Sequence, residues 1–481
     1  MKTTTKFTIL NVASLVLAAL FSFICVSAQG LQTRLISGRV HDGNKGIANV
    51  AVTDGMNIVR TDIDGKYSLL TLSDTRFVYI TIPSGYETEV KDSTIPQFYK
   101  ELTAEENYDF CLKKSDVDVT NHVFFVHSDV QVTSVEDVEL YKSIVADNVA
   151  LKNTYSGMKV FGMDCGDIVG DSPWFFPNYV EAVKPLDMPV FRAIGNHDMD
   201  YFGRTYETSY KTFETYFGPK HFSFDCGDAH YIVIDDNFYT GYGINYFTYV
   251  DEKTFRWLEQ DLAGVAKDKL LFVFMHIPTS LVADLDEAKF GTDEMTNVRQ
   301  FHALFEGYET HIISGHTHFN LNVEFSDKMM EHNTAAACGT WWRTEECMDG
   351  TPHGYAVYEV SGKTVKWYYK SSGYDRDYQM RVYVPGNSED FPEDVIANVW
   401  NYDSRWTVEL LEDGVKTADM VKYTDYDPIS REHCSNREIV LYDWIWPIKN
   451  SHMFHAKPLN PKAKIQVRAT DRFGKVYIHD L

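Results

Sequence analysis

The hydrophobic and polar positions of the chain follow three different patterns in turn. Residues 35–113 alternate short β-prone runs, such as ISGRVHD, ANVAVTDG and FVYITIP, with turns that contain glycine. No helical periodicity interrupts these runs. We therefore predict an all-β sandwich over residues 35–115.

Residues 120–370 follow a different pattern, in which short apolar strands alternate with amphipathic helices. The strands are read in the runs KVFGM, PVFRAI, AHYIVI, KLLFVFM and THIIS. The clearest helix begins with TSVE, which predicts a capping box between Thr133 and Glu136, and continues with apolar residues at helical spacing. This alternation of strands and helices predicts an α/β domain.

Beyond residue 375 the helical signals fade. Runs such as RVYVPG, DVIANVW and REIVLY read as strands between turns, which predicts an all-β domain over residues 376–481. With 481 residues and 44% hydrophobic content, the chain is long enough to bury several cores, in agreement with this division.

The first residues follow the pattern of an export signal. Lys2 and Lys6 precede the apolar stretch ILNVASLVLAALFSFICV, and Val26 and Ala28 occupy the small-residue positions of a cleavage site. We predict a signal peptide over residues 1–28 and no transmembrane span after its removal. An exported protein of the periplasm, the cell surface or the extracellular space is expected, and the lack of an N-x-[ST] sequon favours a bacterial one.

The charge of the chain argues against one class of partner. The formal net charge is -24, from 69 acidic and 45 basic residues, and no long basic run offsets it. We therefore expect no binding to a nucleic-acid backbone. The oligomeric state stays open.

Polar residues gather where the central strands end. They are Asp129, Gln131, Asp167, Asn196, His197, Asp198, His276, His316 and His318. Ligands of open α/β sheets bind outside the carboxyl ends of the strands. Any one of these residues alone is explained by a capped strand end or a satisfied core histidine. Five strands that deliver such groups together favour an ion, because buried polar groups require partners.

The run FFVHSDVQV, residues 124–132, is compatible with more than one interpretation of its polar residues. In a strand, His127, Asp129 and Gln131 would point to one face. A solvated strand end, a satisfied polar network and the start of a metal site all produce such a pattern. His127 itself is interpreted as a supporting or structural residue.

Four motifs in order carry a family resemblance. GDIVGD, GNHD, a single histidine after a strand, and GHTH resemble the calcineurin-like metallophosphoesterase family over about residues 120–345. The resemblance implies a four-layer β-sandwich flanked by helices for the catalytic domain. The layout is similar to secreted bacterial members, with an immunoglobulin-like N-terminal module and a β-rich C-terminal module.

The resemblance also implies a centre of two divalent metal ions. One ion would be held by Asp129, Gln131, Asp167 and His318, and the second by Asp167 as a bridge with Asn196, His276 and His316. Carboxylate, amide oxygen and neutral imidazole suit Mn²⁺, Fe²⁺ or Zn²⁺. The family's usual first motif is D-x-H, whereas this chain has D-x-Q, so Gln131 is the ligand in doubt.

The implied reaction is hydrolysis of phosphomonoesters or phosphodiesters by a hydroxide activated between the two metals. His197 would protonate the leaving alkoxide as general acid, oriented by Asp198. The substrate would be a small molecule, nucleotide, sugar or lipid head group that carries a phosphate ester. The alternative is an inactive cell-surface binding or scaffold protein that retains the fold.

The stretch GTWWRTEECMDGTPHGY offers candidates for substrate binding. Trp341 and Trp342 would stack on a sugar or base, Arg343 would hold an anionic group, and His353 would reach the centre from a turn-rich loop. An equally weighted alternative is that the tryptophans pack the third domain against the second. Trp174 is a further candidate for a wall of the site.

Overall fold

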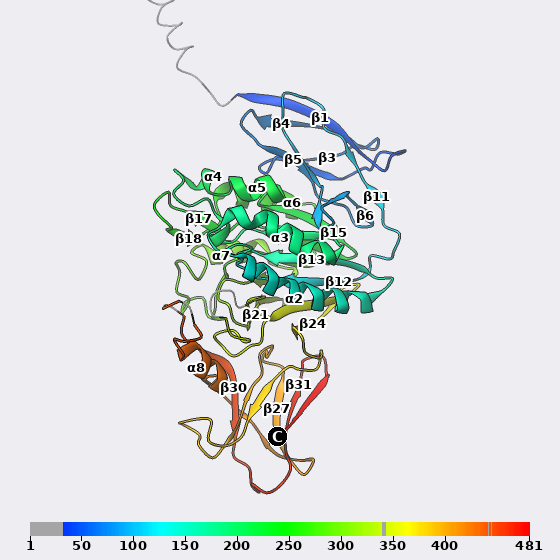
Figure 1. The fold of residues 1–481 in the computed structure, drawn as a ribbon. Coiled ribbons are helices and arrows are strands. Elements are labelled where there is room, and N and C mark those ends of the chain that lie inside the picture. Colours follow the sequence, from blue (N-terminus) through cyan, green and yellow to red (C-terminus); the bar gives the residue numbers. More distant parts are fainter. Residues whose placement is uncertain (1–31, 339–342, 441, 444) are drawn as a thin grey trace, which may run out of the picture.

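The computed structural model describes residues 32–338, 343–440, 442–443 and 445–481, and the predicted signal peptide lies outside this part of the chain. Three β-containing regions follow one another along the molecule (Figure 1). The N-terminal region, drawn in blue, covers one end of the central region, and the C-terminal region, drawn in yellow to red, covers the other.

The N-terminal region is built from strands alone. A three-stranded sheet has the order β10 (Phe110–Cys111), β1 (Thr33–His41), β4 (Lys66–Leu72), and a four-stranded sheet has the order β3 (Ile58–Arg60), β2 (Ala51–Thr53), β5 (Phe77–Ile80), β9 (Tyr99–Glu101). Two short pairs join β11 (Lys113–Lys114) to β6 (Tyr86–Glu87) and β7 (Val90–Lys91) to β8 (Ile95–Pro96). The all-β prediction is confirmed here, while the immunoglobulin-like assignment stays a prediction.

The central region holds two larger sheets. The first has the order β14 (Val190–Ala193), β13 (Lys159–Cys165), β12 (Asn121–His127), β23 (Gly354–Ser361), β24 (Thr364–Ser371). The second has the order β15 (Phe222–Cys226), β16 (Ala229–Val233), β19 (Leu270–Phe274), β20 (Glu309–Ser314), β22 (Met329–Asn333), β21 (Leu321–Ser326). Strands β12, β13 and β14 are parallel, as are β16, β19, β20 and β22, and antiparallel strands complete both sheets.

Alternation along the strands explains why these sheets pack face to face. Phe124 of β12 contacts Phe272 of β19 edge-on, with ring centroids 5.1 Å apart, so this face of each sheet forms a shared core. The neighbouring residue Phe125 belongs instead to the core beneath the helices. Successive side chains of a strand point to opposite faces, and both faces of these central strands are therefore apolar.

Helices cover the outer faces of the two sheets and complete four layers. Helices α2 (Val135–Lys152) and α3 (Phe176–Val183) share a core with the first sheet, and α6 (Glu252–Leu262) and α7 (Val298–Leu304) share one with the second. The short helices α4 (Tyr206–Ser209) and α5 (Lys211–Phe217) lie between β14 and β15 in the chain. The predicted four-layer α/β fold is confirmed.

The start of α2 differs slightly from the predicted capping box. The N-cap is Ser134, whose hydroxyl accepts a hydrogen bond from the Asp137 backbone N–H at 3.2 Å. The carboxylate that reaches back to Thr133 is also that of Asp137, because a helix starting at residue 135 places Asp137, not Glu136, at the third helical position.

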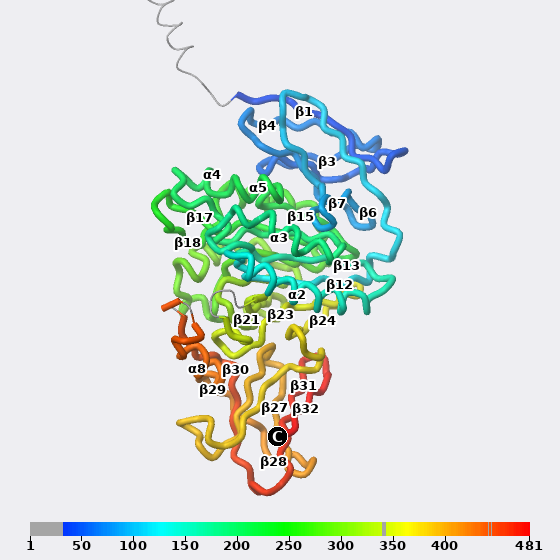
Figure 2. Tube along the Cα trace, in the orientation of Figure 1, coloured from blue at the N-terminus to red at the C-terminus, as the bar shows by residue number. Residues whose placement is uncertain are grey.

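The C-terminal region forms a second β-rich module. One sheet has the order β25 (Arg381–Tyr383), β26 (Val395–Asn398), β30 (Lys449–Ala456), β29 (Val421–Tyr426), and the other has the order β28 (Val415–Asp419), β27 (Thr407–Glu412), β31 (Ile465–Thr470), β32 (Val476–Asp480). Helix α8 (Pro428–Ser435) lies beside β30 in this region (Figures 1 and 2). Within the described residues, no helix has the length and apolar character needed to cross a bilayer.

Candidate metal centre

The predicted ligands come from the loops that follow five parallel strands. Asp129 and Gln131 follow β12, Asp167 follows β13, Asn196 follows β14, His276 follows β19, and His316 and His318 follow β20. Because β12 to β14 belong to one sheet and β19 and β20 to the other, the centre forms where the two sheets meet at their carboxyl ends.

The run FFVHSDVQV does not continue as a strand through its polar residues. Strand β12 ends at His127, and Asp129 and Gln131 adopt left-handed φ angles of 52° and 49°. The expectation that His127, Asp129 and Gln131 share a strand face is therefore wrong. His127 is buried and places Nδ1 2.7 Å from the Tyr141 hydroxyl, in the supporting role expected of it.

Left-handed backbone is concentrated at this centre. Asp129, Gln131, Asp167, His316 and His318 all have positive φ angles, between 49° and 69°. Such conformations are costly for residues with a β-carbon, by about 1–3 kcal/mol each. Backbone hydrogen bonds hold two of these turns, since Asp129 N–H donates to Gly166 O and Gln131 N–H to Asp167 O.

Two motif glycines allow these loops to approach one another. A β-carbon on Gly195, of GNHD, would lie 2.1 Å from the Asp167 backbone nitrogen. A β-carbon on Gly315, of GHTH, would lie 1.7 Å from Ser128 Oγ. Both contacts are far inside van der Waals distance, so only glycine fits at these positions.

The ligand atoms form two groups that share one carboxylate. Asp167, His276 and His316 form one group, Asp129, Asp167 and His318 form the other, and the ligand atoms of each lie within 4.8 Å of one another. His276 Nε2 lies 3.2 Å from Asp167 Oδ2, and His318 Nε2 lies 3.3 Å from Asp129 Oδ1.

Two side-chain amides border these groups. Asn196 Oδ1 lies 3.0 Å from His276 Nε2, so its oxygen already faces the second group. Gln131 donates from Nε2 to Asp167 Oδ2 at 3.0 Å. A half-turn of the Gln131 amide would bring Oε1 to the same place, which is the orientation that a cation requires.

Outer contacts orient the imidazoles. His276 donates from Nδ1 to the Cys165 carbonyl oxygen at 2.7 Å, which directs Nε2 toward Asp167. His316 places Nε2 3.3 Å from Asp293 Oδ1, while its backbone N–H donates to Asp129 Oδ2 at 3.0 Å. Such partners are typical of histidines that hold metals.

The electrostatics of the two groups match a cation site. Burial opposes the charge on Asp167, but the His276 and His197 imidazoles outweigh it and hold the pKa of this carboxyl well below its usual range. Burial likewise opposes the charge on His276, yet Asp167 raises its pKa to about 10. Metal binding at His276 would therefore compete with its proton and release it.

His197 lies at the edge of the centre, with a different partner from the expected one. Its Nδ1 is 2.8 Å from Asp171 Oδ1, and its backbone N–H donates to Asp167 Oδ1 at 2.8 Å. Asp198 instead accepts hydrogen bonds from the backbone N–H groups of Val169 and Gly195. The prediction that Asp198 orients His197 is wrong, because both Asp198 oxygens are used to join the GDIVGD and GNHD loops.

The residues expected to bind substrate have mixed outcomes. Trp341 and Trp342 lie outside the described residues. The Arg343 guanidinium is 2.6 Å from Asp137 Oδ1, so its charge is matched within the protein. His353 is buried immediately before β23, and burial lowers its pKa to about 4. The side chain of Trp174 is 70% exposed and three residues beyond Asp171. Substrate binding by these residues stays a prediction.

Sequence reasoning assigned no role to two carboxylates of the centre. Asp171 holds His197, and Asp293, in a loop before α7, holds His316. The second aspartate of GDIVGD was a usable signal for Asp171, since it lies four residues after a ligand. Nothing in the pattern around Asp293 marks it.

Three models of known protein families match this chain. The N-terminal family model of calcineurin-like phosphoesterases matches residues 34–115, the calcineurin-like phosphoesterase model matches residues 157–320, and the C-terminal model matches residues 331–477. The chain belongs to the calcineurin-like phosphoesterase family. This membership confirms the resemblance, implies divalent metal ions, and supports metal-dependent hydrolysis of phosphoesters by this phosphoesterase.

Solved structures of low identity resemble the phosphoesterase chain. A dimetal phosphatase from Danio rerio is 12% identical, with a TM-score of 0.38, and the match covers 52% of this chain and 96% of the other. A purple acid phosphatase from yellow lupin is 13% identical, with a TM-score of 0.40, and the match covers 71% and 72%. No curated protein sequence matches the chain.

Proposed function

We propose that the protein is an exported phosphoesterase with a binuclear metal centre, which hydrolyses phosphomonoesters or phosphodiesters with His197 as general acid. The observation that carries the proposal is the shared carboxylate of Asp167, which belongs to both groups of ligand atoms. His197 Nε2 lies 3.9 Å from Asp167 Oδ2, beside both groups.

The described residues fit two divalent ions. The first would be held by Asp129, Gln131, Asp167 and His318, and the second by Asp167, Asn196, His276 and His316. When bound, Mn²⁺, Fe²⁺ or Zn²⁺ would supply Lewis acidity to the phosphoryl oxygens and would lower the pKa of water in the site. The histidine nitrogens must be neutral for this, so the His276 proton is released on loading.

In this proposal, His197 delivers a proton to the leaving group. Asp171 accepts the hydrogen bond of Nδ1 and leaves Nε2 directed toward the centre. Burial lowers the pKa of His197, but Asp167 and Asp171 outweigh it and raise the value above normal, which keeps the proton available. The His197 side chain is 23% exposed whereas His276 is fully buried, so substrate would approach from the His197 side.

The direct test is turnover after defined metal loading. The mature chain is stripped with chelator, loaded with Mn²⁺, Fe²⁺ or Zn²⁺, and assayed with 4-nitrophenyl phosphate and bis(4-nitrophenyl) phosphate. We expect hydrolysis of at least one ester with about two ions bound per chain, and none in the stripped protein. Two bound ions without hydrolysis of either ester or of natural phosphate esters would instead support the binding-protein alternative.

A further inference from the structure

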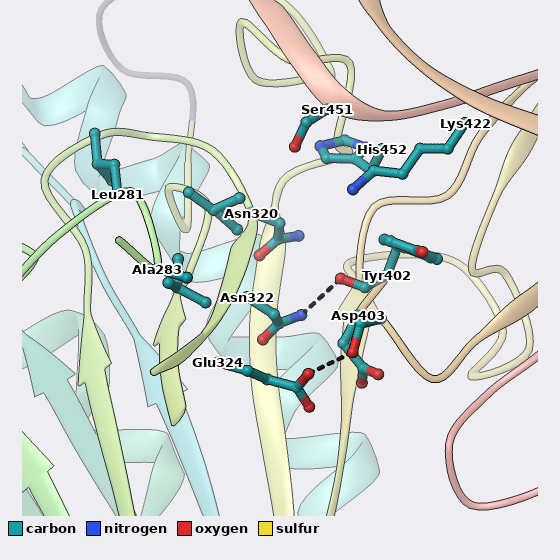
Figure 3. Close-up of a pocket in the computed structure, with 13 residues that line it drawn as sticks. Leu281, Ala283, Asn320, Asn322, Glu324, Tyr402, Asp403, Lys422, Ser451 and His452 are labelled. Carbon is teal, nitrogen blue, oxygen red and sulfur yellow. Dashed lines mark hydrogen bonds between the residues drawn. The ribbon is translucent and has the colours of Figure 1, made fainter. Parts of the chain in front are cut away.

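A cleft of about 290 Å³ lies between the central region and the C-terminal region. Leu281, Asn320 and Asn322 line it from the central side, and Tyr402, Lys422 and His452 line it from the C-terminal side (Figure 3). Asn320 is two residues beyond His318, so the cleft begins within about 7 Å of chain from a predicted metal ligand.

Two buried polar atoms in the cleft wall have no hydrogen-bond partner among the described residues. Asn320 is 5% exposed, and its Oδ1 accepts a hydrogen bond from Ala335 N–H, whereas Nδ2 is unpaired. His452 is 4% exposed and places Nδ1 2.7 Å from Asn398 Oδ1, whereas Nε2 makes no hydrogen bond. A buried polar atom without a hydrogen bond is unfavourable, and a ligand that supplied the missing partner would remove that cost.

The surroundings of His452 indicate what Nε2 can bind. Asn398 donates from Nδ2 to the Asp349 carbonyl oxygen and to Asp427 Oδ2, so its Oδ1 is an acceptor for the His452 Nδ1–H. Asp349 Oδ2 lies 3.3 Å from Nε2 without hydrogen-bond alignment. A hydroxyl group both donates and accepts, and it therefore pairs with Nε2 in either protonation form.

Charges in the cleft leave one cation unmatched. The carboxylates of Glu324 and Asp403 both pair with Arg472, whose Nε lies 2.8 Å from Asp403 Oδ2. Lys422 makes no ion pair with any described residue, and its ammonium lies 4.9 Å from the centre of the Tyr402 ring. Lys422 is an exposed residue, and partial burial lowers the pKa of its ammonium.

Figure 3 shows these groups converging. Lys422 extends from β29 into the cleft, the Asn320 amide nitrogen is directed toward the C-terminal side, and His452 lies above Asn320 and overlaps Lys422 in this view. Two nitrogen donors thus converge beside a site for a hydroxyl group.

We propose that this cleft binds a small hydroxylated anion, with a carboxylate or phosphate group on Lys422 and Asn320 and a hydroxyl group on His452. A charged hydrogen bond to the ammonium supplies most of the affinity, and the hydroxyl contact supplies selectivity. The anion is either the alcohol part of the phosphoester substrate or a separate small molecule, since both carry the same chemistry.

Binding is tested by calorimetry on the metal-loaded protein with three probes. Glycerate carries both groups, acetate carries only the anion, and glycerol carries only hydroxyl groups. We expect saturable binding of glycerate, weaker binding of acetate and none of glycerol. Lys422→Met, which removes the ammonium but keeps most of the unbranched side chain, should weaken glycerate binding by about tenfold or more.

Lys457→Met is the matched control, since Lys457 is an exposed lysine of the same region that pairs with Glu393. It should leave glycerate binding unchanged. Glycerate affinity that is equal in Lys422→Met and wild type would assign the probe to the metal centre and overturn the proposal. Preferred binding of glycerol would overturn it too.

A kinetic arm, which rests on the proposed function, separates the two sources of the anion. If the cleft holds part of the substrate, Lys422→Met should lower kcat/KM for 3-phosphoglycerate by about tenfold and leave kcat/KM for glycerol phosphate unchanged. If the cleft holds a separate molecule, the variant should change kcat/KM for both esters by the same factor. Hydrolysis of neither ester, with glycerate binding intact, would count against the proposed function and not against the anion site.

Discussion

The central region contains two buried clusters of aspartate and histidine, and they differ in how the imidazole nitrogens are used. His230, on β16, places Nδ1 3.0 Å from Asp225 Oδ1 and Nε2 2.8 Å from Asp261 Oδ2. Lys269 adds a second cation 2.8 Å from Asp225 Oδ1. Every charge of this cluster is met by another side chain.

The candidate metal centre is arranged differently. His276 uses Nδ1 on the Cys165 carbonyl group and directs Nε2 at Asp167, the carboxylate that also belongs to the other ligand group. The comparison teaches that proximity of carboxylate and imidazole does not by itself indicate a metal site. Convergence of several ligand atoms on one shared carboxylate does, because only an added cation matches them all.

The largest expected effect comes from removing the shared carboxylate. Asp167→Asn should lose both ions and reduce kcat by about 10³-fold or more, because several kcal/mol of transition-state stabilisation depend on the metals. Metal content by mass spectrometry and phosphate release are the measurements. Asp225→Asn, the matched change in the other cluster, should keep both ions and near-normal activity. Full metal content in Asp167→Asn would contradict the bridging assignment.

Replacing the proposed general acid should act on the leaving group. His197→Gln should reduce kcat by about 10²–10⁴-fold for alkyl phosphates, whose alkoxide needs a proton, and far less for 4-nitrophenyl phosphate. Asp171→Asn should reduce kcat by about tenfold, because Asp171 only orients the His197 imidazole. If His197→Gln reduced kcat by the same factor for both esters, His197 would have a role in binding instead.

The His230 cluster should set part of the pH dependence of stability. Burial lowers the pKa of His230, but Asp261 and Asp225 outweigh it and raise the pKa to about 9. Since the folded pKa exceeds the unfolded value near 6.5, this stabilisation is complete below pH 6.5 and is lost as the pH rises to about 9.

The size of that loss follows from the shift, which corresponds to about 3 kcal/mol. Denaturant unfolding of the metal-free protein at several pH values would measure it, with His230→Gln as the comparison. The variant should be less stable at pH 6 and should lose less stability between pH 6 and 9.5. Parallel pH profiles for the two proteins would show that His230 does not carry the effect.

The smallest expected effect concerns Gln131. Gln131→His should tighten the first ion by about tenfold, equivalent to 1.4 kcal/mol, because imidazole is a better ligand than an amide for these metals. The second ion should keep its affinity, since Gln131 is proposed as a ligand of the first ion only. Chelator competition measures both steps. No change in either affinity would mean that Gln131 is not a ligand.

The motifs anticipated which loops form the centre but not how each residue takes part. GDIVGD, GNHD and GHTH follow apolar strands, so their convergence follows from the parallel sheet. The partner of His197 was predictable only in part, because the second aspartate of GDIVGD marks Asp171 as a residue near the centre, but only the fold brings it to His197. The interdomain cleft was not predictable either, since Asn320 and His452 are far apart in the chain.

What the sequence determined by itself was the local order of strands, helices and polar strand ends, because periodicity of 2 or 3.6 residues and glycine in motifs act over short distances. The tertiary structure decided the rest. Left-handed turns at Asp129 and Gln131, the shared carboxylate of Asp167 and the unmatched ammonium of Lys422 depend on loops from different sheets and regions meeting at one place. Those contacts are set by packing of whole layers, and packing is a property of the folded chain.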